Sequence, residues 1–149
     1  MSDQDKLDSK ATKVPTRMAR QLIMGKGATT DARRTAHLRV ARLILRMRDA
    51  RDRILGEQHF ADPAWDLLLE LYIAKVLDRP LTVGDACIGS RVPLTTGLRW
   101  IAELERVGKV ARVRDPVDRR RTMVVLTDAQ TERMDRFFVL AAELLESPE

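Results

Sequence analysis

The sequence predicts one mainly α-helical domain that carries a small β-hairpin. Three observations lead to this fold class. Apolar residues recur at helical spacing, capping residues and Pro or Gly mark where helices begin and end, and two β-prone segments flank an Asp-Pro turn near residue 116. The length of 149 residues fits a single domain.

The first 33 residues are predicted to be a basic arm without stable structure. They mix Ser, Thr, Asp, Lys and Arg and offer one short apolar patch. A flexible basic arm can reach DNA, although a solubilising tail explains the composition equally well. Its candidate contacts are Arg17, Arg20, Lys26, Arg33 and Arg34. Residues 34–149 form the predicted domain.

Two long helices are expected next. Residues 34–55 place apolar side chains on one stripe and arginines on the other, which predicts an amphipathic helix with a basic outer face that Gly56 can end. The second helix has Asp62 as its N-cap and Pro63 at its first position, and it stops before Pro80.

A helix-turn-helix follows. Thr82 and Asp85 resemble a capping box on a short helix that ends near Gly89. A further helix has Pro93 in its first turn and runs to Gly108. Two helices joined by so short a turn cannot lie antiparallel, so they are expected to cross steeply.

The hairpin comes after this pair of helices. Residues 109–114 and 121–127 are β-prone and enclose the turn, and Asp128 caps a last helix that runs to about Leu145. A helix-turn-helix followed by a basic-tipped hairpin makes a winged helix-turn-helix. The predicted class is therefore mainly α with a small β-hairpin wing.

The sequence resembles one family of this type, the MarR-type (multiple antibiotic resistance regulator) winged-helix transcriptional regulators. The matching residues are TTGLRWIAELE (95–105), Gly108, Arg112, DPVDRR (115–120) and VVLT (124–127). The resemblance covers about residues 62–130. It implies a transcriptional regulator that binds double-stranded DNA sequence-specifically, as a homodimer on a pseudo-palindromic site.

The resemblance does not extend evenly over the chain. Members of this family usually have longer helices after the wing, which build the dimer interface together with the N-terminal helix and often enclose an effector pocket. Here the chain ends at residue 149. Helix 34–55 is therefore a candidate dimerisation element, and a small-molecule effector remains an alternative that no sequence feature supports.

Positive charge is concentrated in two blocks of the sequence. The net charge is +5, but residues 1–53 carry 14 basic and 6 acidic groups and residues 91–121 carry 9 and 4. Each of the two remaining stretches has a net charge of −4. One face that meets a polyanion explains this pattern, so nucleic acid is the leading class of partner.

The recognition helix supplies the first candidate contacts. Leu94, Leu98, Ile101 and Leu104 are predicted to form its buried stripe. The exposed N-terminal positions are then Thr95, Thr96 and Arg99. In the major groove an arginine can bond bidentately to guanine, and a threonine can meet a thymine methyl group or a phosphate. The alternative is a polar helix face that contacts only water.

The wing supplies the second set. Arg119, Arg120 and Arg121 repel one another, and an anionic partner gives a reason for placing them together. Arg119 and Arg120 are predicted to meet the minor groove or phosphates, Arg121 to lean along the strand, and Asp118 to support the wing through an ion pair with one arginine. Candidate phosphate contacts around this footprint are Arg91, Lys109, Arg112 and Arg114.

Three residues near the recognition helix are interpreted as structural. Trp100 is expected in the core, because the chain is only 4% aromatic and offers no stacking platform. Gly97 is costly inside a helix and suggests the close approach of another backbone. Cys87 is expected to be a small buried residue of the preceding helix, with a redox-sensing thiol as the alternative.

No pattern indicates an enzyme. His37 and His59 lie far apart, neither is within ligand spacing of Cys87, and no phosphate-binding loop or nucleophile motif occurs. We therefore expect no catalytic residues, metal or cofactor. A single cysteine and the lack of a signal peptide or membrane span favour the cytoplasm, in association with the nucleoid. The alternative function is a winged helix that binds protein partners in a larger assembly.

Overall fold

The computed structural model describes residues 30–56 and 60–147. It confirms the predicted class, since helices predominate and one small antiparallel sheet accompanies them. The elements in order are α3 (Thr30–Leu55), α4 (Pro63–Val76), β1 (Leu81–Thr82), α5 (Val83–Gly89), α6 (Leu94–Arg106), β2 (Val110–Arg114), β3 (Thr122–Leu126) and α7 (Asp128–Glu146). Helix α3 begins at Thr30, inside the stretch predicted as an arm, and residues 1–29 lie outside the described residues.

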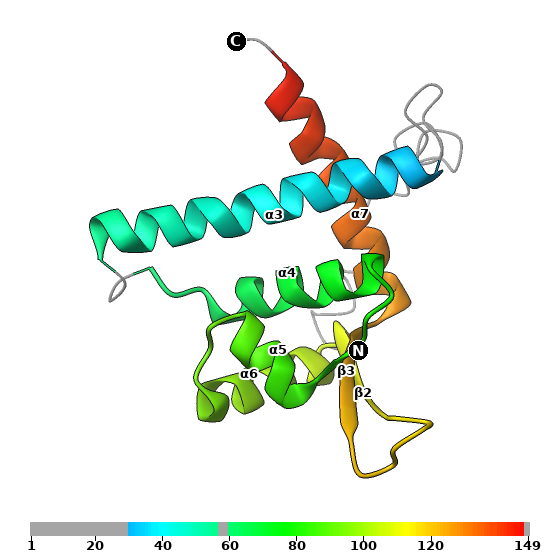
Figure 1. The fold of residues 1–149 in the computed structure, drawn as a ribbon. Helices are drawn as coiled ribbons and strands as arrows, with labels where there is room; N and C mark the ends of the chain where they lie inside the picture. Colours follow the sequence, from blue (N-terminus) through cyan, green and yellow to red (C-terminus); the bar gives the residue numbers. More distant parts are fainter. Residues whose placement is uncertain (1–29, 57–59, 148–149) are drawn as a thin grey trace, which may run out of the picture.

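Helix α4 lies at the centre of the fold. It is placed between α3 on one side and α5 and α6 on the other (Figure 1), and it also packs against β3. Its buried residues are Leu67, Leu68, Leu69, Leu71, Tyr72 and Ala74. These side chains point in almost every direction around the helix, which is typical of a helix with neighbours on all sides. The sequence predicts a broad buried face for this helix, and this face omits Leu67 and Leu71. The residues of the predicted face are Trp65, Leu68, Leu69, Tyr72, Ile73, Val76 and Leu77.

Besides the earlier start of α3, the helix starts agree with the sequence at two places and differ at two. Asp62 accepts a hydrogen bond from the Trp65 N–H at 3.3 Å, and Thr82 accepts one from the Asp85 N–H at 3.1 Å, as predicted. Helix α7 is capped by Thr127 instead of Asp128. Pro93 is the N-cap of α6 and not a residue of its first turn, because its ψ of 140° is extended.

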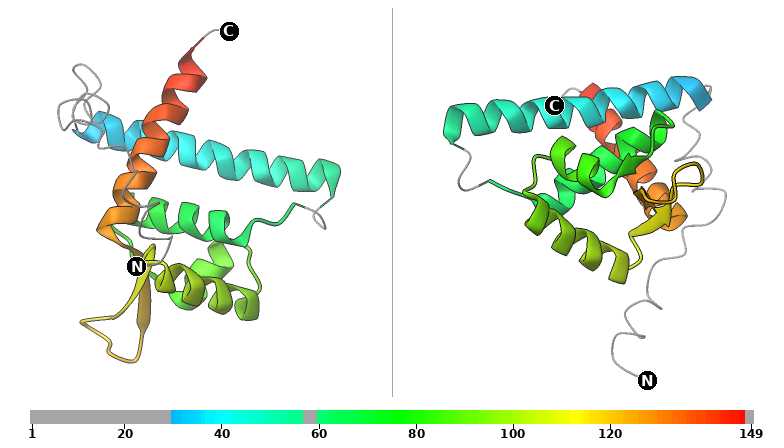
Figure 2. Two further views of the ribbon diagram at one scale, coloured as in Figure 1. Left: turned by 180° about the vertical axis from the view of Figure 1, so that it is seen from behind. Right: turned by 60° about the horizontal axis from the view of Figure 1, so that its bottom comes forward.

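The sheet anchors the wing. Strand order is β1-β3-β2 and both pairings are antiparallel, with Leu81 opposite Val124 and Val110 opposite Leu126. The prediction missed β1, because two residues are too short to show a strand pattern. The hairpin of β2 and β3 extends away from α3, on the same side of the molecule as α6 (Figures 1 and 2).

The buried face of α6 differs from the predicted one. Gly97, Ile101 and Leu104 face the core, whereas Leu94 and Leu98 are 58% and 42% exposed. Trp100 is half-buried against the core, in keeping with its structural interpretation. The predicted stripe was wrong at its start because it counted apolar side chains only, and glycine is the residue that lets this end of α6 approach the core.

Gly97 is where α6 meets α5. A Cβ atom at this position would overlap the Sγ of Cys87 and lie 3.3 Å from its Cβ. The close approach that the sequence indicates is therefore real, but a side chain makes it, not a backbone. Burial raises the pKa of the Cys87 thiol, which favours the unreactive protonated form at neutral pH.

We expect Gly97→Ala to lower the free energy of unfolding by about 1–3 kcal/mol, because the added methyl group overpacks this contact. Urea unfolding would measure the change. Gly84→Ala is the matched control, since its nearest neighbour is the Thr82 Oγ1 at 4.0 Å. Adding Cys87→Ala should restore part of the loss in the Gly97 variant. Equal effects of the two glycine substitutions would contradict this explanation.

Candidate nucleic-acid interface

The N-terminal half of α6 presents an exposed surface of mixed character. Thr95 and Arg99 are exposed, as the sequence predicts, while Thr96 is half-buried. Leu94 and Leu98 lie on the exposed surface as well, and the sequence analysis missed them as candidate contacts. The buried run Gly97, Ile101 and Leu104 was the signal that could have revealed them. This surface offers a guanidinium group, hydroxyl groups and methyl groups.

The C-terminal half of α6 is electrostatically neutralised. Arg106 donates to both carboxylate oxygens of Glu103, at 2.9 and 2.5 Å, and this bonding lowers the pKa of Glu103. Glu105 is paired with Arg112 of β2 at 2.7 Å. Arg99, by contrast, has no charged or hydrogen-bonded partner within the described residues. Uncompensated positive charge on this helix is thus confined to its N-terminal half.

The three wing arginines have different environments. Asp118 accepts hydrogen bonds from the backbone N–H and the Nε of Arg120, at 3.1 and 3.2 Å, so the ion pair expected in the hairpin forms with Arg120. Arg121 lies 3.9 Å from Asp115. The side chain of Arg119 is exposed and contacts no charged group in the part of the chain that the structure describes.

The wing tip is held by two acidic residues. The Oδ1 of Asp115 accepts hydrogen bonds from the N–H groups of Val117 and Asp118, at 2.8 and 3.3 Å. Asp118 in turn bonds Arg120, which lowers the pKa of the Asp118 carboxyl group. Both carboxylates therefore order the turn that displays Arg119. Val117, which is 93% exposed, adds an apolar side chain to this tip.

The four candidate phosphate contacts fall into two groups. Lys109 and Arg114 donate to uncharged oxygens, at Gln130 (3.4 Å) and at the carbonyl of Arg119 (3.2 Å), so their positive charge is not neutralised by these bonds. Arg112 is paired with Glu105, as described above. Arg91 points away from the wing and toward α3, where it meets two carboxylates.

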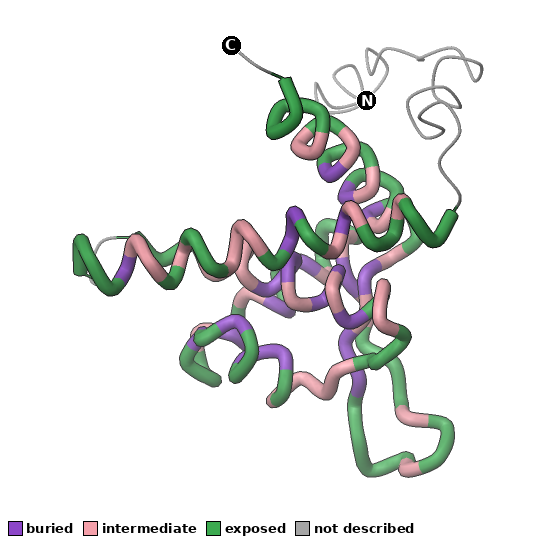
Figure 3. Tube along the Cα trace, turned by 45° about the horizontal axis from the view of Figure 1, so that its top comes forward, coloured by how far each residue is buried: buried purple, intermediate pink, exposed green. Residues whose placement is uncertain are grey.

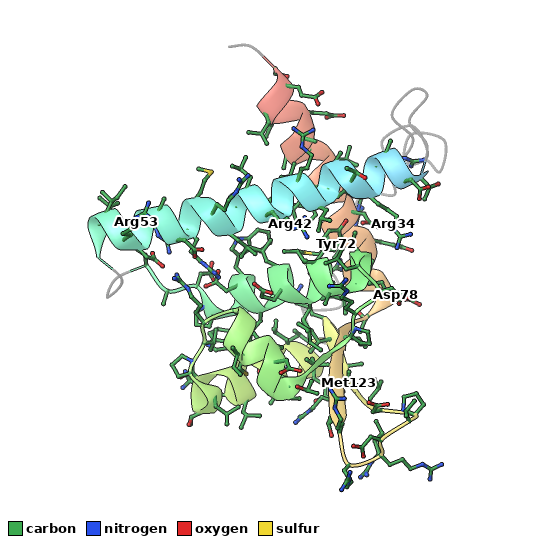
Figure 4. All side chains as sticks on the ribbon, viewed as in Figure 1. Arg34, Arg42, Arg53, Tyr72, Asp78 and Met123 are labelled. Carbon is green, nitrogen blue, oxygen red and sulfur yellow. The ribbon has the colours of Figure 1, made fainter. Side chains whose placement is uncertain are left out.

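His37 takes part in a cluster of polar side chains. His37 is buried, with its Nδ1 2.9 Å from the hydroxyl of Tyr72, which donates to Asp135 at 2.6 Å. This cluster joins α3, α4 and α7, and Figure 4 labels Tyr72 between the first two helices. A cavity of about 400 Å³ opens beside it, lined by residues of α3, α4 and α7. His59 lies outside the described residues.

Two kinds of functional feature are absent from the described residues. Among residues 30–56 and 60–147, no cluster of His, Cys, Asp and Glu could hold a metal ion. No helix in these ranges is both long enough and apolar enough to cross a membrane.

Comparison with solved structures identifies the fold. The chain is similar to MepR of Staphylococcus aureus in its complex with DNA, with 21% identity, 70% of this chain and 82% of MepR covered, and a TM-score of 0.50. The fold is therefore a winged helix-turn-helix, the fold class that the sequence predicts. No family model and no curated protein matches the sequence.

Two further structures give similar results. MepR in its DNA-binding conformation has 21% identity over 70% of this chain and 74% of its own, with a TM-score of 0.49. A probable transcriptional regulator from Pseudomonas aeruginosa has 22% identity over 68% and 76%, with a TM-score of 0.46.

The wing geometry predicts how Asp118 titrates. Its pKa should lie below the usual aspartate value, because Arg120 donates to its charged form. An NMR titration that follows the carboxyl carbon would measure it. Arg120→Gln should raise this pKa, whereas Arg119→Gln, at a side chain that does not contact Asp118, should leave it unchanged. The same rise in both variants would show that general charge, not this hydrogen bond, sets the value.

Proposed function

We propose that the protein is a regulator of transcription that binds double-stranded DNA sequence-specifically. The observation that carries this proposal is that Arg99 on α6 and Arg119 on the wing have no charged partner among the described residues, and that both elements lie on the side of the molecule opposite α3 (Figure 1). The major groove of B-DNA is about 12 Å wide and admits an α-helix, while a flanking hairpin reaches the backbone or the minor groove.

Each exposed side chain has a role in this arrangement. Arg99 reads a guanine, and Leu94, Thr95 and Leu98 contact thymine methyl groups. Thr96 bonds a phosphate through its hydroxyl group. Arg119 enters the minor groove or meets its phosphates, where narrow A·T-rich segments attract arginine.

The cations around this footprint strengthen binding without reading sequence. Lys109 and Arg114 have no carboxylate partner in these contacts and keep their full charge. A phosphate that binds one of the paired arginines must weaken its ion pair with a carboxylate; the paired arginines are Arg112, Arg120 and Arg121. MepR, which the chain resembles in fold, is itself found in a complex with DNA. A protein with this function acts in the cytoplasm, at the nucleoid.

A second copy of the chain completes the proposed binding unit. The C-terminal turns of α7 expose Leu140, Leu144 and Leu145, which are 54%, 67% and 60% exposed, and Figure 3 shows these turns projecting from the body. A groove of about 670 Å³ runs between α3 and the end of α7, lined in part by Val40, Leu43, Leu45, Ala142 and Leu145. Apolar surface of this kind typically marks a protein interface.

Charge complementarity favours a second copy as the occupant. Arg39, Arg42 and Arg46 give the groove a basic rim, although Glu146 lines it as well, and Glu143 and Glu146 make the exposed end of α7 acidic. In a two-fold symmetric dimer, the acidic end of one α7 meets the basic rim of the other copy, and each contact occurs twice. Such a dimer presents two copies of α6 to successive major grooves.

The DNA proposal predicts distinct losses for its two main arginines. After selection of a preferred duplex from a random pool, Arg119→Ala should reduce the slope of log affinity against log salt concentration by about 0.9 for each bound chain, since each chain loses one phosphate contact. Arg99→Ala should cost about 1–3 kcal/mol of binding free energy and relax the motif at one base pair. Fluorescence anisotropy over a salt series would measure both.

Arg53→Ala is the matched control for both substitutions. Arg53 lies at the end of α3, far from the wing (Figure 4), so its loss should leave affinity and salt slope unchanged. The proposal of sequence-specific DNA binding would be refuted if the selection yields no common motif and the wild type binds duplex DNA no better than a generic basic protein does. That result would favour the alternative of a protein-interaction module.

The dimer proposal predicts that Leu144→Glu produces a monomer. Burying a leucine contributes about 1.5–3 kcal/mol, and two-fold symmetry doubles the loss. Sedimentation velocity should show the wild type at twice the 17.0 kDa chain mass and the variant at that mass. Val117→Glu, which places the same charge on an exposed apolar residue of the wing, should remain dimeric. A wild-type monomer at micromolar concentration would overturn the proposal.

A further inference from the structure

Arg91 has an unusual backbone conformation in the turn between α5 and α6. Its φ is 57°, in the left-handed region that non-glycine residues seldom adopt, and its N–H donates to the carbonyl of Ile88 at 3.0 Å. Glycine or asparagine would fit this position with less strain. An arginine here indicates that its side chain forms interactions that compensate for the backbone.

The side chain of Arg91 leaves the helix-turn-helix and reaches α3. Its Nη2 donates to the Oδ2 of Asp52 at 2.6 Å, and its Nη1 lies 3.4 Å from the Oδ1 of Asp49. Helix α4 lies between α3 and α6 (Figure 1), so this ion pair links the turn directly to a helix on the far side of the core element. The side chain of Asp52 is only 10% exposed.

Both carboxylates are themselves held in place. Arg51 bonds the other oxygen of Asp52 at 2.6 Å and also donates to the carbonyl of Phe60 at 3.0 Å. Asp49 lies 3.3 Å from Arg48, which in turn pairs with Asp66 of α4 at 3.1 Å. The two carboxylates that meet Arg91 are therefore held in place by contacts that do not involve the turn between α5 and α6.

We propose that Asp52 and Asp49 hold Arg91 and thereby set the position of the N-terminal end of α6, which makes Arg91 a positioning residue and not a DNA contact. This inference rests on the proposed function, in which α6 reads DNA. It assigns a task to the C-terminal part of α3, and it replaces the expectation that Arg91 binds phosphate.

The two roles of Arg91 make opposite predictions. As a phosphate contact, Arg91 would be weakened by its carboxylates, so removing Asp52 would free a cation and tighten DNA binding. As a positioning residue, Arg91 needs Asp52, so removing either partner misplaces the same end of α6. A phosphate would also have to compete with a short bond to a nearly buried carboxylate, in which the donor and acceptor are both charged.

The test compares Asp52→Asn, Arg91→Gln and the double variant on the duplex selected with the wild type. We expect each single variant to lose about fivefold or more in affinity and the double variant to lose no more than either one, because they disrupt one contact. The salt slope should stay at the wild-type value. Arg91→Lys, which can still pair with Asp52, should recover most of the affinity.

Asp31→Asn is the matched control for the change of charge on α3, since Asp31 is exposed on the first turn, and it should bind as the wild type does. Thermal unfolding confirms that each variant is folded at the assay temperature. Tighter binding by Asp52→Asn, a salt slope reduced by about 0.9 for each bound chain in Arg91→Gln, or an Asp52→Asn variant indistinguishable from the control would overturn the inference.

A readout without DNA separates this inference from the proposed function. In amide ¹H–¹⁵N spectra, Asp52→Asn should shift the resonances of α6 from Leu94 to Leu98, and Asp31→Asn should not. If the wild type binds no duplex, the proposed function fails, and these shifts still decide whether Asp52 positions α6. Unchanged α6 resonances in Asp52→Asn would refute the coupling.

Discussion

The burial of α4 on almost all sides is the constraint on which the rest of the structure depends. A helix with apolar side chains in nearly every direction needs neighbours all round, and here α3, α5, α6 and β3 supply them. The helix-turn-helix and the wing thus lie on one side of α4, and α3 lies on the other side (Figure 1). Polar side chains that approach this core form hydrogen bonds with one another in the cluster of His37, Tyr72 and Asp135.

The sequence predicted the fold well where helix ends are chemically marked. Asp62 with Pro63, and Thr82 with Asp85, gave the correct starts of two helices, because a side-chain cap is a local interaction between residues close in sequence. Strand β1 and the buried residues Leu67 and Leu71 could not be predicted in the same way. Their burial depends on neighbours that are distant in the chain, which a periodic pattern does not name.

The candidate site was predictable in its location and less so in its details. The spacing of residues placed Arg99 and Arg119 on the correct elements. It predicted that Asp118 pairs with one wing arginine but could not show that this arginine is Arg120, because the turn's geometry decides it. It also missed the carboxylate partners of Arg112 and Arg121, since Glu105 lies on another element and Asp115 lies across the turn. It also placed Arg91 with the phosphate contacts, since no pattern reveals that Asp49 and Asp52, some forty residues earlier, meet it.

The pairing of arginines therefore divides the basic residues by task. An arginine that already has a carboxylate partner must give up part of that bond when it meets a phosphate, so its net contribution to binding is reduced. Arg99 and Arg119 have no such bond among the described residues to give up, and they retain their full charge for a partner. Arg51 and Arg91 stand at the other extreme, because nearly buried Asp52 holds them both. Arginines near α3 thus stabilise the fold through ion pairs, whereas arginines near α6 form the proposed binding surface. The position of the carboxylates decides which of these two roles an arginine has.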